Sequence, residues 1–513
     1  MADASRQTDL RPTAPAIALI GIGVPALCGL AALPLLWRSI MRLAALLSYP
    51  YPHDGLEGTL SYEAGLLRAG LPLYQPLELH RFVSAPYPPL HPLLLGFAAQ
   101  IAGPHIFWGG RLLSLVCALG VTLLIVLIVR HCSGSWLAGL LGTALFLSTP
   151  PVLLWATRIK PDMLALLWTA LGLYLATRAM RSPTADQPLL GPIGAAVCFV
   201  LAFYTKQTAI AAPLAVGLAL LTLDLRGFRA GARAGYIGRL PLRRRTLAFG
   251  LTYLILLTCT LLLLDAITSG QFSFHTLVMH RRASWSPYLL AKFVALLAPY
   301  WPALLLGLAL LVRAIRDERA LVPACYLLLV PLSLIGAGKT GANHNHLLES
   351  LLALSLAAGI AVGWAAEVWP RQLPAAALLL ALFAVQLALA FQPQPWYASE
   401  LAPADSPERY LTFIRNTPGE ILADDVALLY MLGRPLRYDD PSGMGPVAIS
   451  GAWDQRGLVE EINQRRFSAI MIPVNVERES FDPAGRWTPK MLLAIREHYQ
   501  LKFHDTIDTY VPK

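Results

Sequence analysis

Ionisable and polar side chains that could carry out group transfer occur in five short clusters, separated by long apolar segments. A carboxylate can act as a general base, and a lysine or arginine can bind a phosphate group. The clusters are His53-Asp54-Gly55-Leu56-Glu57, Arg158-Ile159-Lys160-Pro161-Asp162, Lys206, His280-Arg281-Arg282, and Asn343-His344-Asn345-His346 with Glu349.

The composition identifies the chain as a polytopic membrane protein. Of its 513 residues, 56% are hydrophobic and only 14% are charged, whereas soluble domains carry about 25% charged residues. The net charge of +10 arises mainly from basic residues in short loops between apolar segments. This distribution follows the topology rule for cytoplasmic loops, so we do not expect nucleic-acid binding.

Apolar segments long enough to cross a bilayer predict an all-α bundle of about eleven transmembrane helices. The expected spans are 14–36, 106–130, 135–155, 161–178, 189–205, 207–224, 246–268, 288–314, 320–338, 346–366 and 374–392. The segment 89–103 is short and flanked by prolines, and we interpret it as a juxtamembrane helix. The arginine-rich loop 226–245 is then cytoplasmic, and all five clusters lie on the opposite face.

Two regions outside the spans predict further structure. The first outer loop, about 37–105, is rich in apolar residues and should pack as short helices on the membrane surface. Residues 1–392 form the expected membrane unit. In residues 393–513, helical patterns at 406–416, 425–431, 456–466 and 488–498 alternate with short β-branched or apolar runs at 421–423, 469–472 and 509–511. This alternation predicts a small C-terminal α/β domain on the extracytoplasmic side.

Asp54 and Glu57 are three residues apart, so on a helical turn they share one face. That spacing suits general-base catalysis or the binding of a divalent cation. The same residues also fit a helix N-terminus, with Asp54 as the cap and Glu57 supporting it.

Asp162 and Lys206 each stand at the outer end of an apolar segment. Asp162 could simply stabilise a helix N-terminus, and Lys206 could extend its amine to the interface. Their position beside the other clusters instead favours a phosphate site, to which Arg281 and Arg282 would add charge.

The order of the motifs resembles the GT-C class of membrane glycosyltransferases, and within it the protein mannosyltransferases and lipid A aminoarabinose transferases. The resemblance covers about residues 10–390. Its motifs are Asp54-x-x-Glu57, Gly70-Leu71-Pro72-Leu73-Tyr74, Tyr87-x-Pro89, Arg111, Arg158-x-Lys160-Pro161-Asp162, Tyr204-x-Lys206 and Gly341-Ala342-Asn343.

The resemblance implies transfer of a sugar from a polyprenyl-phosphate donor to a lipid, glycan or protein acceptor, with inversion, at the outer face of a bacterial inner membrane. Asp54 would be the catalytic base, with Glu57 as the alternative base. Asp162 would be a further catalytic residue, the acid of the second outer loop, which assists acceptor positioning or electrostatics. Lys206 would bind the donor phosphate, whereas phosphate binding by His280, Arg281 and Arg282 is inferred from their charge. The full set of candidate substrate- and phosphate-binding residues is Lys206, Arg158, Lys160, His280, Arg281, Arg282, Asn343, His346 and Glu349. No cofactor is required.

Two other classes of function remain open. A transporter or flippase would also place charges in a membrane bundle, although its sites normally lie near the middle of the membrane. A metal-dependent enzyme could draw ligands from His344, His346, Glu349, Asp54 and Glu57. We predict no specific metal site, although a divalent cation could bind.

The topology gives a first prediction. A reporter fused after Lys513 should be active only if it functions outside the cytoplasm, because the loop 226–245 holds the cytoplasmic side. Paired alkaline phosphatase and fluorescent-protein fusions would measure this. A C-terminus in the cytoplasm would contradict the predicted number of spans and divide the five clusters between both faces.

Overall fold

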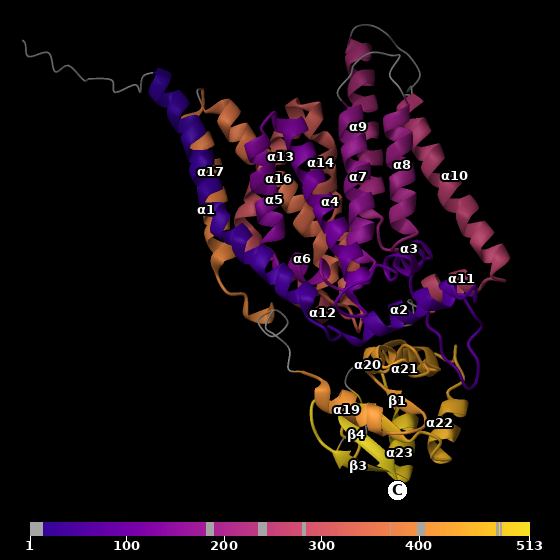
Figure 1. Cartoon of the computed structure of the whole chain (residues 1–513). Helices are drawn as coiled ribbons and strands as arrows, with labels where there is room; N and C mark the ends of the chain where they lie inside the picture. The colour runs from indigo at the N-terminus through magenta and orange to yellow at the C-terminus, as the bar shows by residue number, and fades with distance from the viewer. Residues whose placement is uncertain are drawn as a thin grey trace, which may run out of the picture.

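The computed structural model describes residues 14–180, 189–233, 244–279, 284–369, 371–397, 406–478, 482 and 485–513. Long helices form a bundle, and a smaller α/β unit caps one end of it (Figure 1). The predicted fold class, a helical polytopic membrane protein with a small C-terminal α/β domain, is confirmed.

The bundle is built from the apolar segments. Its helices are α1 (Ala14–Ser48), α4 (Trp108–Ser133), α5 (Trp136–Leu147), α6 (Pro150–Trp155), α7 (Asp162–Ala179), α8 (Leu190–Phe203), α9 (Ala211–Arg233), α10 (Arg244–Ile267), α11 (Gln271–Ser273), α12 (Pro287–Ala295), α13 (Trp301–Arg316), α14 (Leu321–Leu329), α15 (Pro331–Leu334), α16 (Leu348–Val368) and α17 (Leu373–Phe391). Short 3-10 or π turns, η1 (Phe274–Val278), η3 (Ala298–Tyr300), η4 (Glu318–Ala320), η5 (Ile335–Gly338), η6 (His344–Leu347) and η7 (Pro395–Tyr397), connect or extend them.

Each of the eleven predicted spans coincides with helix. Within the described residues, eight helical segments are long and apolar enough to cross a membrane. Three predicted spans are not among these eight segments, namely 135–155, 161–178 and 189–205. The helices that begin in them are α5 with 12 residues, α7 with 18 and α8 with 14. The first helix also differs, because α1 continues to Ser48 and takes up the start of the predicted outer loop.

Charged residues lie at both ends of the helices α4 and α7. Arg111 lies in the first turn of α4 and Arg130 in its last; Asp162 begins α7 and Arg178 lies in its last turn. The two helices pack side by side. One end of the bundle therefore carries the candidate chemistry, and the other carries basic residues. Part of the loop 226–245 lies outside the described residues.

The outer loop between α1 and α4 contains two helices, as expected. They are α2 (Gly55–Arg68) and α3 (Leu90–Ala98), and they pack against each other. Asp54 caps α2: its backbone is extended, and its carboxylate accepts the N–H of Glu57 at 3.3 Å. A cap of this kind satisfies a backbone donor that the helix leaves unpaired.

The C-terminal α/β domain holds a four-stranded sheet in the order β1-β2-β4-β3, formed by β1 (Ile421–Ala423), β2 (Ala469–Ile472), β3 (Tyr499–Phe503) and β4 (Asp508–Pro512). β1 and β2 are parallel, and the other pairs are antiparallel. The helices are α19 (Glu408–Asn416), α20 (Val426–Met431), α21 (Pro441–Ile449), α22 (Arg456–Asn463) and α23 (Pro489–His498). The sequence patterns did not predict the strand β3 or the helix α21.

The domain docks on the outer loop through α20, which packs against α2 (Figure 1). Gly58 permits this contact, because a Cβ atom at that position would lie 2.3 Å from the Cα of Ala427. That distance is shorter than real Cβ contacts allow. A helix of the C-terminal domain thus reaches the first turn of the helix that Asp54 caps.

Candidate active site

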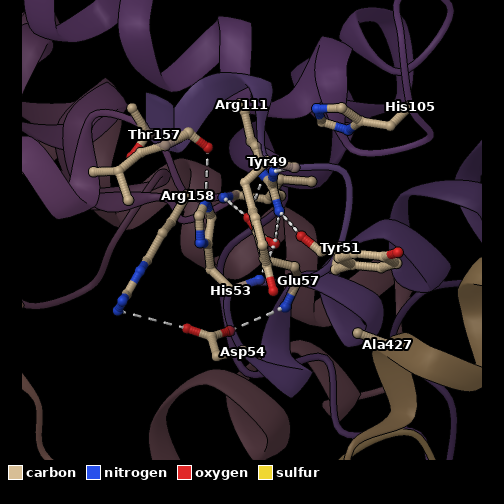
Figure 2. Close-up of polar contacts among 12 residues, drawn as sticks. Tyr49, Tyr51, His53, Asp54, Glu57, His105, Arg111, Thr157, Arg158 and Ala427 are labelled. Atoms are coloured by element: carbon tan, nitrogen blue, oxygen red, sulfur yellow. Dashed lines mark hydrogen bonds and ion pairs between the residues drawn. The ribbon is translucent and has the colours of Figure 1, made fainter. Parts of the chain in front are cut away.

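A buried ion pair between Arg111 and Glu57 lies at the centre of the candidate site (Figure 2). Both side chains have 0% exposure. The guanidinium donates to Glu57 from Nε at 3.1 Å and from Nη2 at 2.7 Å. Arg111 also donates to the backbone carbonyls of Tyr49 and Tyr51 at 2.5 and 2.6 Å. This one arginine therefore ties α4 to the loop that precedes α2.

The Glu57 carboxylate links two further backbone segments. It accepts the N–H of Ile159 at 3.0 Å and that of His53 at 2.9 Å. Burial by itself would raise the pKa of Glu57, but the Arg111 charge and hydrogen bonds outweigh it and hold the pKa below its ordinary value. With both oxygens engaged, Glu57 is suited to positioning its neighbours.

Asp54 occupies a different environment from Glu57. Its side chain is 29% exposed, and its carboxylate lies 2.9 Å from Nζ of Lys160. The same carboxylate is 4.0 Å from a guanidinium nitrogen of Arg158 (Figure 2). Burial raises the pKa of Asp54, while Lys160 and then Arg158 lower it by more. The net shift is downward, so Asp54 is ionised at neutral pH and faces a cationic surface.

The loop between α6 and α7 supplies these cations. Ser114 of α4 donates to the carbonyl of Arg158 at 2.7 Å, and Glu57 holds the next residue, Ile159. The Arg158 guanidinium also lies 5.3 Å from the centre of the Trp155 ring. Fixing the backbone on both sides directs Arg158 and Lys160 toward Asp54.

A second ion pair joins Asp162 to Lys206. The two are in direct contact, with side-chain exposures of 2% and 12%. Asn345 donates to the same Asp162 oxygen at 2.9 Å. A small cavity of about 30 Å³ lies between these side chains and Glu349. Residues from α7, the α8–α9 turn and the segment before α16 therefore meet at this cavity.

The other residues predicted for the site lie outside the two ion pairs. Glu349 lines the cavity and accepts the hydroxyl of Tyr326 at 3.2 Å. The His346 ring packs near Gly336. Asn343 is exposed and accepts the N–H of His344, so its contact is local. His280, Arg281 and Arg282 lie outside the described residues.

The proposed metal ligands do not converge in the described part of the chain. No group of three His, Cys, Asp or Glu side chains there is placed to hold a metal ion. The carboxylates of Asp54 and Glu57 form ion pairs with different cations. The His344 ring packs among the rings of Trp155, Phe293 and Tyr397.

Two residues of the site had no role assigned from the sequence. Arg111 stands at the start of an apolar helix and was named only among the motif residues of the resemblance, which was a usable signal. Asn345 was passed over in favour of Asn343. Only the helical phase after residue 343 decides which amide turns toward Asp162.

The fold is similar to that of the GT-C membrane glycosyltransferases. Residues 86–237, fewer than a third of the chain, match the family described as dolichyl-phosphate-mannose-protein mannosyltransferase. The resemblance to the protein mannosyltransferase and aminoarabinose transferase group is thereby confirmed. No curated protein matches the chain.

Solved structures with this fold include ArnT from Cupriavidus metallidurans bound to undecaprenyl phosphate. It is 13% identical with a TM-score of 0.58, over 93% of this chain and 97% of that one. The archaeal oligosaccharyltransferase AglB from Archaeoglobus fulgidus, in complex with an inhibitory peptide and a dolichol-phosphate, is 12% identical. Its TM-score is 0.51, over 96% of this chain and 74% of that one. At such identities the likeness establishes the fold.

The central ion pair yields a stability prediction. Replacing Arg111 by Met leaves the Glu57 carboxylate buried without its cation, which should cost about 3–5 kcal/mol. Thermal unfolding of the detergent-purified variant would measure the loss. The control is Arg415→Met, which breaks an exposed pair with Glu408 and should cost no more than about 1 kcal/mol. Equal destabilisation of the two variants would contradict the central role of Arg111.

Proposed function

We propose that the protein transfers a hexose or pentose from a polyprenyl-phosphate donor to a lipid, glycan or protein acceptor, with inversion. Catalysis takes place at the extracytoplasmic face of a bacterial inner membrane. The observation that carries this proposal is the partly exposed Asp54 carboxylate beside Lys160 and Arg158. The GT-C fold and the lipid phosphates bound by ArnT and AglB support the class of donor.

The cations of the site suit a phosphate monoanion or dianion. Lys160, Arg158 and Lys206 are largely withdrawn from solvent, so their attraction for a bound phosphate is less screened than on an open surface. Each lysine is paired with a carboxylate in the free protein, which limits the cost of its burial. An incoming phosphate would share these cations with Asp54 and Asp162.

The reaction is a single displacement at the anomeric carbon. Asp54 accepts the proton of the acceptor hydroxyl as the new oxygen–carbon bond forms. The bond between the anomeric carbon and the phosphate oxygen breaks, and its electron pair leaves with the polyprenyl phosphate. Cationic side chains stabilise the developing charge on that phosphate. One displacement inverts the anomeric centre.

Asp162 acts on this reaction through its neighbours. It holds the Lys206 amine in place together with Asn345, while Glu349 completes the cavity wall. Glu57, buried behind Asp54, keeps the loops that carry Asp54 and Lys160 in register. We therefore assign proton transfer to Asp54 and positioning to Asp162 and Glu57.

Asp54→Asn should abolish transfer while donor binding is retained. The amide preserves shape but cannot accept the proton, and loss of a general base typically costs about 10²–10⁴-fold. Transfer from a panel of undecaprenyl-phosphate hexoses and pentoses would measure this. The control Glu57→Gln should reduce thermal stability along with activity, because it weakens the Arg111 pair. Near-normal transfer by Asp54→Asn would disprove its role as the base.

Lys206→Ala should raise the apparent donor requirement more than the acceptor requirement. Loss of a charge-assisted contact in a shielded site is worth about 1.5–3 kcal/mol, or roughly 10- to 100-fold in donor affinity. Titration of donor at fixed acceptor, and the reverse, would separate the two. Lys490→Ala, an exposed lysine of the C-terminal domain, is the matched control. An unchanged donor dependence would restrict Lys206 to supporting Asp162.

A further inference from the structure

A carboxylate of the C-terminal domain lies against the first residue of α2. Asp425 caps α20, with its Oδ1 accepting the N–H of Ala427 at 3.1 Å. A Cβ atom built on Gly55 would lie 3.3 Å from this Oδ1 and 3.4 Å from the carbonyl oxygen of Asp424. Gly55 directly follows Asp54 in the chain. Two acidic residues from separate domains are thus brought together at the N-terminus of one helix.

The charges around Asp425 are mainly negative. Its pKa is raised to about 7 by burial and then by Asp54, Asp424 and Glu57, against a lowering by the Ala427 N–H. Asp424, its chain neighbour, is engaged by Arg486 at 2.5 Å and by the Trp487 indole at 2.9 Å. Within the described residues no lysine or arginine forms an ion pair with Asp425.

The cations beside Asp54 limit its affinity for a proton. Lys160 and Arg158 hold its pKa low, which keeps it ionised but makes it a weak proton acceptor. Efficient general bases have a pKa close to the working pH. A negative charge on Asp425 raises the basicity of Asp54, because like charges favour the protonated form.

We propose that Asp425 is a positioning residue of the transfer site, supplied by the C-terminal domain, whose carboxylate keeps Asp54 basic enough to take the acceptor proton beside Lys160 and Arg158. This inference rests on the proposed function. Docking of α20 on α2 is what delivers the carboxylate. The close approach at Gly58 fixes that docking.

The test is the pH profile of kcat/KM for the full-length protein in detergent, with undecaprenyl-phosphate hexoses and pentoses as donors and membrane lipids, glycans and proteins as acceptors. In the wild type, transfer should rise through about pH 7, where Asp425 ionises. Asp425→Asn should lose this rise and fall roughly threefold to tenfold below wild type at about pH 8, as expected for up to one pKa unit of lost basicity. Asp425→Glu, which keeps a carboxylate at this position, should show the wild-type rise.

Two controls separate this effect from folding. Asp454→Asn makes the same change at an acid of the same domain that pairs only with Arg456 among described partners, and it should leave the profile unchanged. Gly58→Ala should displace α20 and weaken the rise, whereas Gly65→Ala, with no atom within 4 Å of its new Cβ, should keep it.

The outcomes distinguish this inference from the proposed function. If the wild type transfers sugar and Asp425→Asn keeps the wild-type profile, the role of Asp425 is overturned and the transferase function stands. If the wild type transfers from no donor of the panel, both are overturned. Loss of the rise in Asp425→Asn, with its return in Asp425→Glu, supports the inference.

Discussion

The geometry of the site depends on the fully buried pair of Arg111 and Glu57. A buried ion pair adds little net stability, since desolvation offsets the attraction, but removing one partner is costly. Here the pair connects elements far apart in sequence: Glu57 receives the N–H groups of His53 and Ile159, which flank Asp54 and Lys160 respectively. Its main contribution is to fix the distance between a carboxylate and its cations.

Ion pairing explains how several charged side chains can be buried close together in the candidate site. Asp54 balances Lys160, and Asp162 balances Lys206, so each lysine can be buried without a ligand. A phosphate entering between them would compete with both carboxylates for the same cations. Donor binding and the basicity of Asp54 are consequently linked, because a cation drawn toward phosphate lowers the pKa of Asp54 less.

Sequence patterns predicted the elements better than the contacts between them. Apolar length located the helices, since a bilayer requires long uninterrupted apolar runs, and the strands β1, β2 and β4 were recognised from their apolar residues. The ion pairs between these elements were harder to predict. The spacing of Asp54 and Glu57 suggested one shared function, but the turn from loop to helix directs Glu57 inward to Arg111 and leaves Asp54 partly exposed. Such divergence depends on tertiary packing, which local spacing does not encode.

The contact between the C-terminal domain and α2 is a second feature that the sequence patterns did not predict. Asp425 stands in no motif, and its local pattern indicates only a helix cap. Its significance arises from the contact at Gly58, where the absence of a side chain lets α20 approach α2. Because electrostatic effects in a shielded region extend over several ångströms, a carboxylate on the C-terminal domain can alter the proton affinity of Asp54. The membrane bundle and the C-terminal domain therefore form one electrostatic unit at their contact.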